Sequence, residues 1–223
     1  MARGRIDPVR LVCAFFALLI GAATAALAQD PAARYRVTVA MNWAGDAGGM
    51  HPDMPHWSRL IAVAHTSRYA LIEDGQTASS GLALVATNGR VSVLEAELAE
   101  ARRRGRAGMP VVLPGIADGV GRFEFEIDLT ERHARVSFAT MLAPSPDWFS
   151  GVSGADLRGG GDWKDIAVLP LWVWDAGADS GLDFEGPNID TQPRQSVRLL
   201  THTAFLRPDG LDPIGTVTFE RIR

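Results

Sequence analysis

Two short acidic segments hold the residues of this sequence that are best placed to do chemistry together. Asp147 follows two prolines in segment 144–148 (PSPDW), and proline fixes φ, so this aspartate is held in a restricted turn. Asp175 and Asp179 flank Gly177 in segment 174–181 (WDAGADSG). Glycine lets the backbone fold back, so both carboxylates and nearby carbonyls can converge on one cation. Hard oxygen ligands on a flexible loop suit Ca²⁺.

The second segment is not an EF-hand loop. Counted from Asp175, position 6 is Ser180 where an EF-hand has Gly, and position 12 is Gly186 where it has Glu. Ordinary Asp/Gly turn chemistry therefore stays open as an alternative to metal binding. Asp156 and Asp183 are further carboxylates nearby, and we expect both to be solvated.

Histidines form a second group of candidates, in segment 51–57 (HPDMPHW) and at His65. His51, Asp53 and His56 have the residue types of a zinc site. The two prolines of the segment argue against the helical H-E-x-x-H arrangement. The favoured interpretation is a structured loop whose histidines form hydrogen bonds and pack.

A third possibility is hydrolysis of a glycosidic bond by a carboxylate pair such as Asp147 and Asp175. No G-x-S-x-G nucleophile elbow occurs, and segment 159–161 (GGG) is not followed by the G-K-[ST] of a phosphate-binding loop. A formal net charge of −4 gives no electrostatic case for binding nucleic acid.

Strands dominate the elements that must position these residues. Residues 35–41 and 123–129 alternate between apolar and polar side chains, which predicts half-buried strands. Further strands are expected at 136–142 and near 217–219. Segment 166–174 is more continuously apolar, which favours a strand buried on both sides, with an edge or bulge at Pro170.

One helix is well supported by its pattern. Segment 92–95 (SVLE) resembles a capping box, Val91, Leu94 and Leu98 form an apolar stripe, and Gly105 suits the C′ position. Arg102 to Arg104 could bind an anion, although a solvated helix end is favoured. A shorter helix is expected near 80–85, and long loops at 44–56, 144–163 and 175–193. The pattern predicts an antiparallel β-sandwich with one or two short helices.

Residues 1–28 have the pattern of a secretory signal peptide. Three arginines precede an apolar run at 11–20, and segment 26–28 (ALA) is a cleavage site that ends at Ala28. The run is too short to span a bilayer, so no membrane span is expected after cleavage. Cleavage also removes Cys13, the only cysteine, so residues 29–223 would form one exported domain without a disulfide, secreted or periplasmic.

Taken together, these motifs resemble the spondin domain family, which includes the N-terminal domains of F-spondin and mindin and stand-alone bacterial forms. The resemblance covers about residues 34–222. The matching segments are Tyr35-Arg36-Val37-Thr38 leading to Trp43, His56-Trp57-Ser58-Arg59-Leu60-Ile61 with Ala64-His65, Ala78-Ser79-Ser80-Gly81, Pro144-Ser145-Pro146-Asp147-Trp148-Phe149 with Gly151-Val152, Trp174-Asp175-Ala176-Gly177 with Asp179-Ser180-Gly181, Pro187-Asn188, and Phe219-Glu220-Arg221-Ile222.

The resemblance implies an all-β, antiparallel β-sandwich similar to a C2 domain, with a calcium ion at one end. By the matching motifs, Asp147, Asp175 and Asp179 would be its ligands. Members with assigned roles act in the extracellular matrix and in cell adhesion, as binding modules without catalysis. The cysteines that animal members carry between the two acidic motifs are absent here, so their partner specificity does not transfer.

Three functions follow as hypotheses. The first is an exported, non-catalytic Ca²⁺-binding module that recognises an extracellular or envelope ligand, a protein or a glycan. The second is a secreted glycan-acting hydrolase that uses the aspartates. The third is a structural envelope protein whose metal only supports the fold. The sequence names no partner and no oligomeric state.

Overall fold

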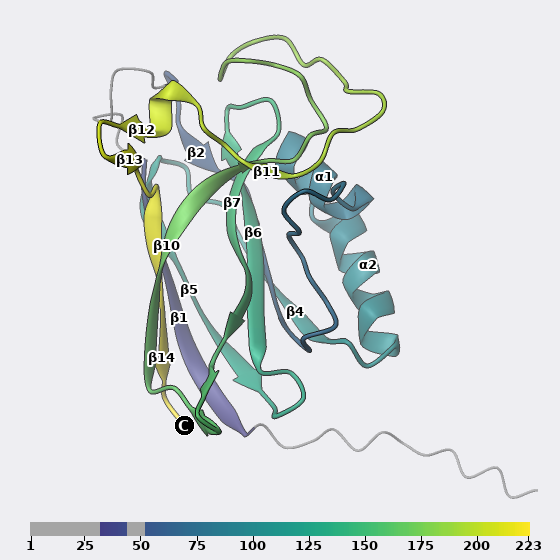
Figure 1. Cartoon of the computed structure of the whole chain (residues 1–223), viewed down its shortest axis with the longest axis vertical. Helices are drawn as coiled ribbons and strands as arrows, with labels where there is room; N and C mark the ends of the chain where they lie inside the picture. Colours follow the sequence, from purple (N-terminus) through teal and green to yellow (C-terminus); the bar gives the residue numbers. More distant parts are fainter. Residues whose placement is uncertain (1–31, 44–51) are drawn as a thin grey trace, which may run out of the picture.

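The computed structural model describes residues 32–43 and 52–223, which form two packed β-layers and a helical layer (Figure 1). The expected signal peptide, its cleavage site, Cys13 and His51 lie outside the described residues. The long strands are β1 (Ala33–Asn42), β3 (Leu60–His65), β4 (Ala107–Leu113), β5 (Val120–Leu129), β6 (Arg135–Ala143), β7 (Trp148–Asp156), β10 (Ile166–Asp175) and β14 (Gly215–Arg221). The short elements are β2 (His56–Trp57), β8 (Arg158–Gly159), β9 (Asp162–Trp163), β11 (Arg198–Leu199), η1 (Thr203–Phe205), β12 (Leu206–Arg207) and β13 (Gly210–Leu211).

Strand β10 joins the two β-layers. Its residues 166–171 pair with β14, whereas residues 172–175 pair with β7. The order of the long strands is therefore β4-β3-β6-β7-β10-β14-β1-β5, with every pairing antiparallel. The first and last strands of this order lie against each other without pairing, so the sheet nearly closes around its core. The expected all-β fold is confirmed.

Strands β1 and β5 show how the alternating pattern builds that core. Along β1 every second side chain is buried, and β5 behaves the same way from Phe123 onward. Val37 lies opposite Phe125 on β5 and Phe219 on β14, so three apolar side chains meet on the inner face. The prediction of half-buried strands is correct at both places.

The prediction that β10 is buried on both sides is wrong for its first half. Ile166 and Val168 are 62% and 57% exposed, because that half has one face in the core and the other in solvent. Pro170 lies in this half, opposite Thr216 of β14 and with no strand paired on its other side. Proline has no N–H to donate there, so its edge position is the expected one.

The two helices form a third layer. Helices α1 (Ser80–Asn88) and α2 (Ser92–Arg103) cover the outer face of the β-layer that contains β6 (Figure 1). A second apolar cluster lies between this face and the helices. It contains Ile61, Val63, Ala139 and Phe149 from the strands and Leu82, Val85, Leu94 and Leu98 from the helices.

The capping box expected at Ser92 is not formed. Helix α2 already includes Ser92, and Val91 at its N-cap makes no side-chain hydrogen bond. Ser79 instead caps α1 by accepting from the N–H of Leu82. The expected C′ glycine is confirmed, since Gly105 has a left-handed φ of 65°.

The loop expected at 144–163 is largely strand, since it contains β7, β8 and β9. Strand β7 begins with two aromatic side chains but continues through small and polar ones, which hide its pattern. One of these small residues is Gly151, where a side chain has no room because an added Cβ would lie 2.1 Å from the carbonyl oxygen of Phe138 on β6. The loop expected at 175–193 is confirmed and carries only an isolated bridge between Asp179 and Asp190.

Candidate functional site

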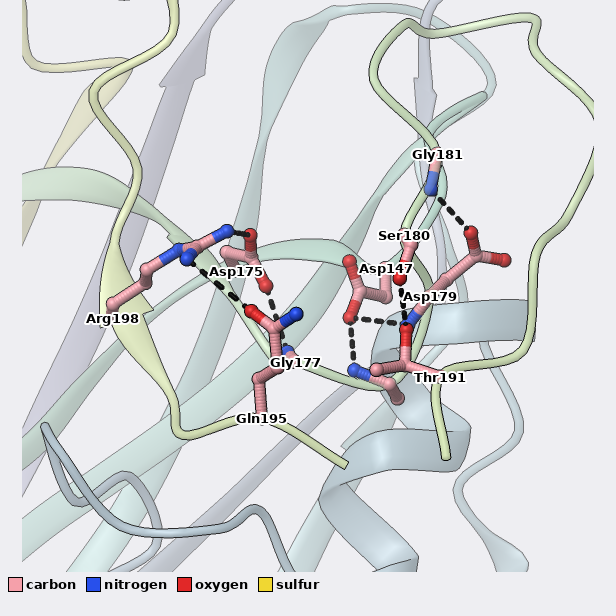
Figure 2. A network of polar contacts seen from close by, with 10 residues as sticks. Asp147, Asp175, Gly177, Asp179, Ser180, Gly181, Thr191, Gln195 and Arg198 are labelled. Carbon is pink, nitrogen blue, oxygen red and sulfur yellow. Dashed lines mark hydrogen bonds and ion pairs between the residues drawn. The ribbon is translucent and has the colours of Figure 1, made fainter. Parts of the chain in front are cut away.

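The turn between β6 and β7 fixes Asp147 at one end of the sandwich (Figure 2). The Ala143–Pro144 peptide bond is cis, and Ser145 accepts a hydrogen bond from the N–H of Trp148, which tightens the turn. The side chain of Asp147 is completely buried. The turn thus inserts a carboxylate into the interior, where an unpaired charge is costly.

The two oxygens of Asp147 have different surroundings. Oδ2 accepts hydrogen bonds from the N–H of Ala178 at 2.6 Å and of Asp179 at 3.0 Å. Oδ1 is buried and has no hydrogen-bond partner. Because Ala178 and Asp179 belong to the second acidic segment, Asp147 holds the two segments together with one oxygen and leaves the other unsatisfied.

Asp175 is the last residue of β10, and its carboxylate is paired with a cation. Oδ2 accepts from Nη2 of Arg198 at 2.8 Å, and Oδ1 accepts from the N–H of Gly177 at 2.7 Å. Gly177 has φ 68°, and a Cβ there would lie 2.4 Å from the carbonyl oxygen of Gln195. Glycine is therefore required at this position for the loop to turn back against residues 195–198.

Asp179 organises the outer part of the loop. Its Oδ1 accepts from the N–H of Gly181 at 2.7 Å and of Ile189 at 3.0 Å, and the residue is 9% exposed. The hydroxyls of Ser180 and Thr191 also contact each other at 2.5 Å. Much of this loop is thus held by Asp/Gly turn chemistry, the alternative that the sequence left open.

The carboxylate of Asp147 is hard to ionise. Burial above all, and then the neighbouring Asp175 carboxylate, raise its pKa to about 6, although the hydrogen bonds from Ala178 and Asp179 act in the opposite direction. A positive charge supplied at Oδ1 would favour the ionised form.

The structure brings the three predicted aspartates to one end of the fold, which we call the acidic end. In Figure 2 Asp147 lies between Asp175 and Asp179. Among the described residues, no three His, Cys, Asp or Glu side chains are gathered as a set of metal ligands. The distinctive atom of this group is Oδ1 of Asp147, a buried carboxylate oxygen that lacks a hydrogen-bond partner. Asp156 and Asp183 are exposed, as expected.

The two histidines of the zinc hypothesis that the structure describes, His56 and His65, do not come together. His56 is exposed and its Nδ1 contacts the carbonyl oxygen of Met54 at 2.9 Å. His65 is buried, with Ser137 Oγ 2.7 Å from its Nε2. His56 pairs with one end of β6 and His65 with the other, about 25 Å apart at 3.3 Å per residue.

Comparison with known proteins identifies the family of this chain. A family model for the spondin N-terminal domain (Spondin_N) matches residues 33–209. This chain belongs to the spondin N-terminal domain family.

Vertebrate spondins are among the relatives of this spondin domain. Spondin-2 of Rattus norvegicus is 35% identical over 207 residues, which cover 86% of this chain and 63% of the rat protein. Spondin-2 of Homo sapiens is 32% identical over 235 residues, covering 96% and 71% of the two chains. Spondin-1 of Mus musculus is 35% identical over 209 residues, covering 85% of this chain and 25% of the mouse protein. The chain thus spans less than two thirds of the rat and mouse relatives.

Sequence reasoning missed Arg198, the cation that the spondin domain places against Asp175. No spacing or motif points to it, because it lies in the two-residue strand β11, which meets β10 only after the intervening loop has folded back. The Asp147 contact with residues 178 and 179 was likewise not readable from spacing, since it joins segments 31 and 32 residues apart.

Proposed function

We propose that this spondin domain is an exported, non-catalytic module that binds Ca²⁺ at its acidic end and recognises an extracellular or envelope ligand. The supporting observation is Asp147 Oδ1, a buried carboxylate oxygen with no donor. A buried polar atom without a partner calls for an explanation, and an ion that is absent is one of the accepted ones.

The donor chemistry fits a hard cation. Asp147 would bind through Oδ1, with Asp175 and Asp179 as the other candidate ligands, and Ca²⁺ takes six to eight oxygens of this kind. Bound Ca²⁺ would supply the positive charge that ionised Asp147 lacks, and it would join the two acidic segments at the site where they already meet.

Non-catalytic recognition is supported by the relatives of this chain and by the burial of the Asp147 carboxylate. The relatives carry the name spondin, and the family resemblance links such domains to matrix and adhesion roles. A glycan hydrolase would need two accessible carboxyl groups about 5–10 Å apart. Asp147 is fully buried and Asp175 is paired with Arg198, an arrangement that does not favour the hydrolase alternative.

In the described residues no helix has the length and apolar character needed to cross a membrane.

Thermal unfolding in EDTA and in millimolar Ca²⁺ tests the metal. We expect Ca²⁺ to raise the Tm, since a ligand at 100 times its Kd adds about 2.7 kcal/mol to the free energy of unfolding. Asp147→Asn keeps an acceptor for the N–H groups of Ala178 and Asp179 but removes the charge, so its Tm should no longer respond to Ca²⁺.

Asp183→Asn is the matched control, because Asp183 is an exposed carboxylate in the same loop. It should keep the full response. An unchanged Tm of the unmodified protein across both conditions would overturn the calcium proposal. Capture of envelope or matrix components on the immobilised domain then separates a recognition module from a protein whose metal only supports the fold.

A further inference from the structure

A cluster of arginines lines a pocket at the opposite end of the molecule from the acidic end. The pocket has a volume of about 500 Å³ and is lined by Arg68, Arg104, Arg106 and Arg132, together with Thr66 and Ser67; we call it the arginine pocket. The residues come from three separate segments, after β3, between α2 and β4, and between β5 and β6. The run of arginines at the end of α2 thus becomes part of a surface that no single segment predicts.

Most of the positive charge in this pocket is uncompensated. Arg104 pairs with Glu100, its Nε lying 2.7 Å from Oε1. Among the residues that the structure describes, Arg68, Arg106 and Arg132 form no ion pair with a carboxylate. Three guanidinium groups are therefore brought together without a counter-charge, although the chain as a whole carries a formal charge of −4.

Backbone contacts hold the pocket in shape. The N–H of Thr66 donates to the carbonyl oxygen of Arg106 at 2.9 Å, which ties the loop after β3 to the turn after α2. Gly105 has φ 65°, and an added Cβ would lie 2.8 Å from Nη2 of Arg132. The absence of that Cβ lets the Arg132 guanidinium lie directly against the turn.

A second pocket of about 630 Å³ lies beside the arginine pocket and shares Gly105 and Arg132 with it. Its lining differs in kind, because it holds the carboxylates of Glu126 and Asp128 and apolar side chains such as Met109, so the site proposed below is the arginine pocket alone. At about 500 Å³ the arginine pocket is larger than a free oxyanion requires, so it has room for an anionic group that is carried by a larger molecule. The lining of the arginine pocket itself has no aromatic side chain on which a base could stack and no aliphatic one to hold an acyl chain.

We propose that the arginine pocket binds a phosphate or sulfate ester carried by a glycan. Guanidinium groups stay ionised and donate paired N–H groups to the oxygens of such tetrahedral anions, and the hydroxyls of Thr66 and Ser67 add donors of the kind that sugars and esters accept. The chain is acidic overall, so the charge of this pocket is opposite in sign to the net charge of the molecule.

Titration calorimetry with dextran sulfate and unmodified dextran, at 0.15 M NaCl, tests the proposal. The unmodified protein should bind dextran sulfate and not dextran. The variant R68A/R106A/R132A should bind at least tenfold more weakly. The control R59A/R90A/R122A removes the same charge from exposed arginines outside the pocket, and its Kd should change less than threefold.

Competition measurements distinguish an ester on a glycan from a free inorganic anion. Phosphorylated dextran should compete for the same site, whereas inorganic sulfate or phosphate should compete only at far higher concentration. Arg132→Lys keeps the charge but loses the planar fork of donors, so it should weaken binding at least threefold, while Arg59→Lys should not. Because these two variants conserve charge, they also serve if the triple variant fails to fold.

Three results would overturn the proposal. One is equal weakening by both triple variants, which would mean that net charge alone attracts the polymer. Another is failure of the unmodified protein to bind either modified dextran. The third is binding to phosphatidylglycerol vesicles, lost in the pocket variant, without binding to modified dextrans, which would assign the pocket to a lipid headgroup.

Discussion

At the scale of single residues, Asp147 is the most informative side chain in the molecule. The flanking prolines indicated a constrained turn, which the structure contains. The family resemblance implied that the three aspartates lie at one end of the fold, where the structure brings them (Figure 2), and their role as metal ligands stays a prediction. The sequence did not reveal that Oδ2 is satisfied by the backbone while Oδ1 is not. The difference between the two oxygens depends on the position that residues 178 and 179 take against Asp147 in the folded chain, and residue types do not reveal that position.

Arg198 should oppose calcium binding, because its guanidinium occupies Asp175 Oδ2 at 2.8 Å. In Arg198→Gln the carboxylate loses this competitor, and the affinity for Ca²⁺ should rise by roughly threefold to tenfold, since the arginine side chain is 59% exposed and its charge is partly screened. The measurement is titration calorimetry with CaCl₂ at 0.15 M NaCl.

Arg36→Gln provides the control for Arg198→Gln, because Arg36 also forms an exposed ion pair, with Glu220, on the paired strands β1 and β14 away from the acidic segments. Its Ca²⁺ affinity should equal that of the unmodified protein. A weaker Ca²⁺ affinity in Arg198→Gln would show that Arg198 supports the site and does not compete for it.

His65 should make the protein sensitive to acid. Its Nδ1–H donates to the carbonyl oxygen of Thr66, and its Nε2 accepts from the hydroxyl of Ser137, which itself accepts from the N–H of Gly154. In this arrangement the imidazole is neutral, and protonation would reverse its contact with Ser137. Burial, together with the charges of Arg135 and His133, lowers the pKa of His65 below its ordinary 6.5, against the hydrogen bond to Thr66.

The unfolded chain therefore binds a proton on His65 at a pH where the folded protein does not. The contribution of His65 to the free energy of unfolding is complete above pH 6.5 and decreases as the pH falls below it. Urea unfolding between pH 7.5 and 5.5 should show a smaller loss of stability in His65→Gln than in the unmodified protein. His56→Gln, at an exposed site, should keep the original pH dependence; equal slopes in all three proteins would contradict this assignment.

At the scale of elements, the sequence predicted the long alternating strands and the existence of both helices, but misplaced the cap between the helices. Glu97 of α2 accepts from the hydroxyl of Ser79 at 2.6 Å and from the N–H of Gly81 at 2.8 Å. A cap that is completed by a neighbouring helix leaves no local sequence signal. Strand β7 was missed for a similar reason, since close packing on β6 selects small side chains there.

The two serines should therefore differ in their effect on stability. Ser79→Ala removes the acceptor for Leu82 N–H and a partner of Glu97, so the free energy of unfolding should fall by about 1–2 kcal/mol. Ser92→Ala removes no capping bond and should cost less than about 0.5 kcal/mol. Urea denaturation of both variants measures the difference, and a larger cost at Ser92 would restore the capping box expected from the sequence.

At the scale of the whole molecule, the near-closed sheet depends on β10, whose two halves pair with different layers. The sequence indicated a sandwich, but it did not indicate that β10 changes its pairing partner from β14 to β7. Which strands pair depends on the tertiary fold, and the pattern along β10 does not record it. Strand β6 then separates two sites of opposite charge. Its Ala143 end leads to Asp147, and its Arg135 end pairs with His65, next to Thr66 of the arginine pocket.

The two ends should act independently. The length of β6 puts them roughly 25 Å apart, about three Debye lengths at 0.15 M ionic strength, so the charge of one end is screened from the other. The Kd for dextran sulfate should differ by less than twofold between Asp147→Asn and the unmodified protein, and R68A/R106A/R132A should keep its Ca²⁺-dependent rise in Tm. A tenfold change in the Kd for dextran sulfate would reveal a coupling free energy of about 1.4 kcal/mol between the two ends, which screened charges at this separation do not supply. Loss of the Ca²⁺-dependent rise in Tm in the pocket variant would point to the same coupling. Such a result would require the sheet itself to change shape when one end is occupied, and it would make this spondin domain a switch with two inputs and not a module with two separate contact sites.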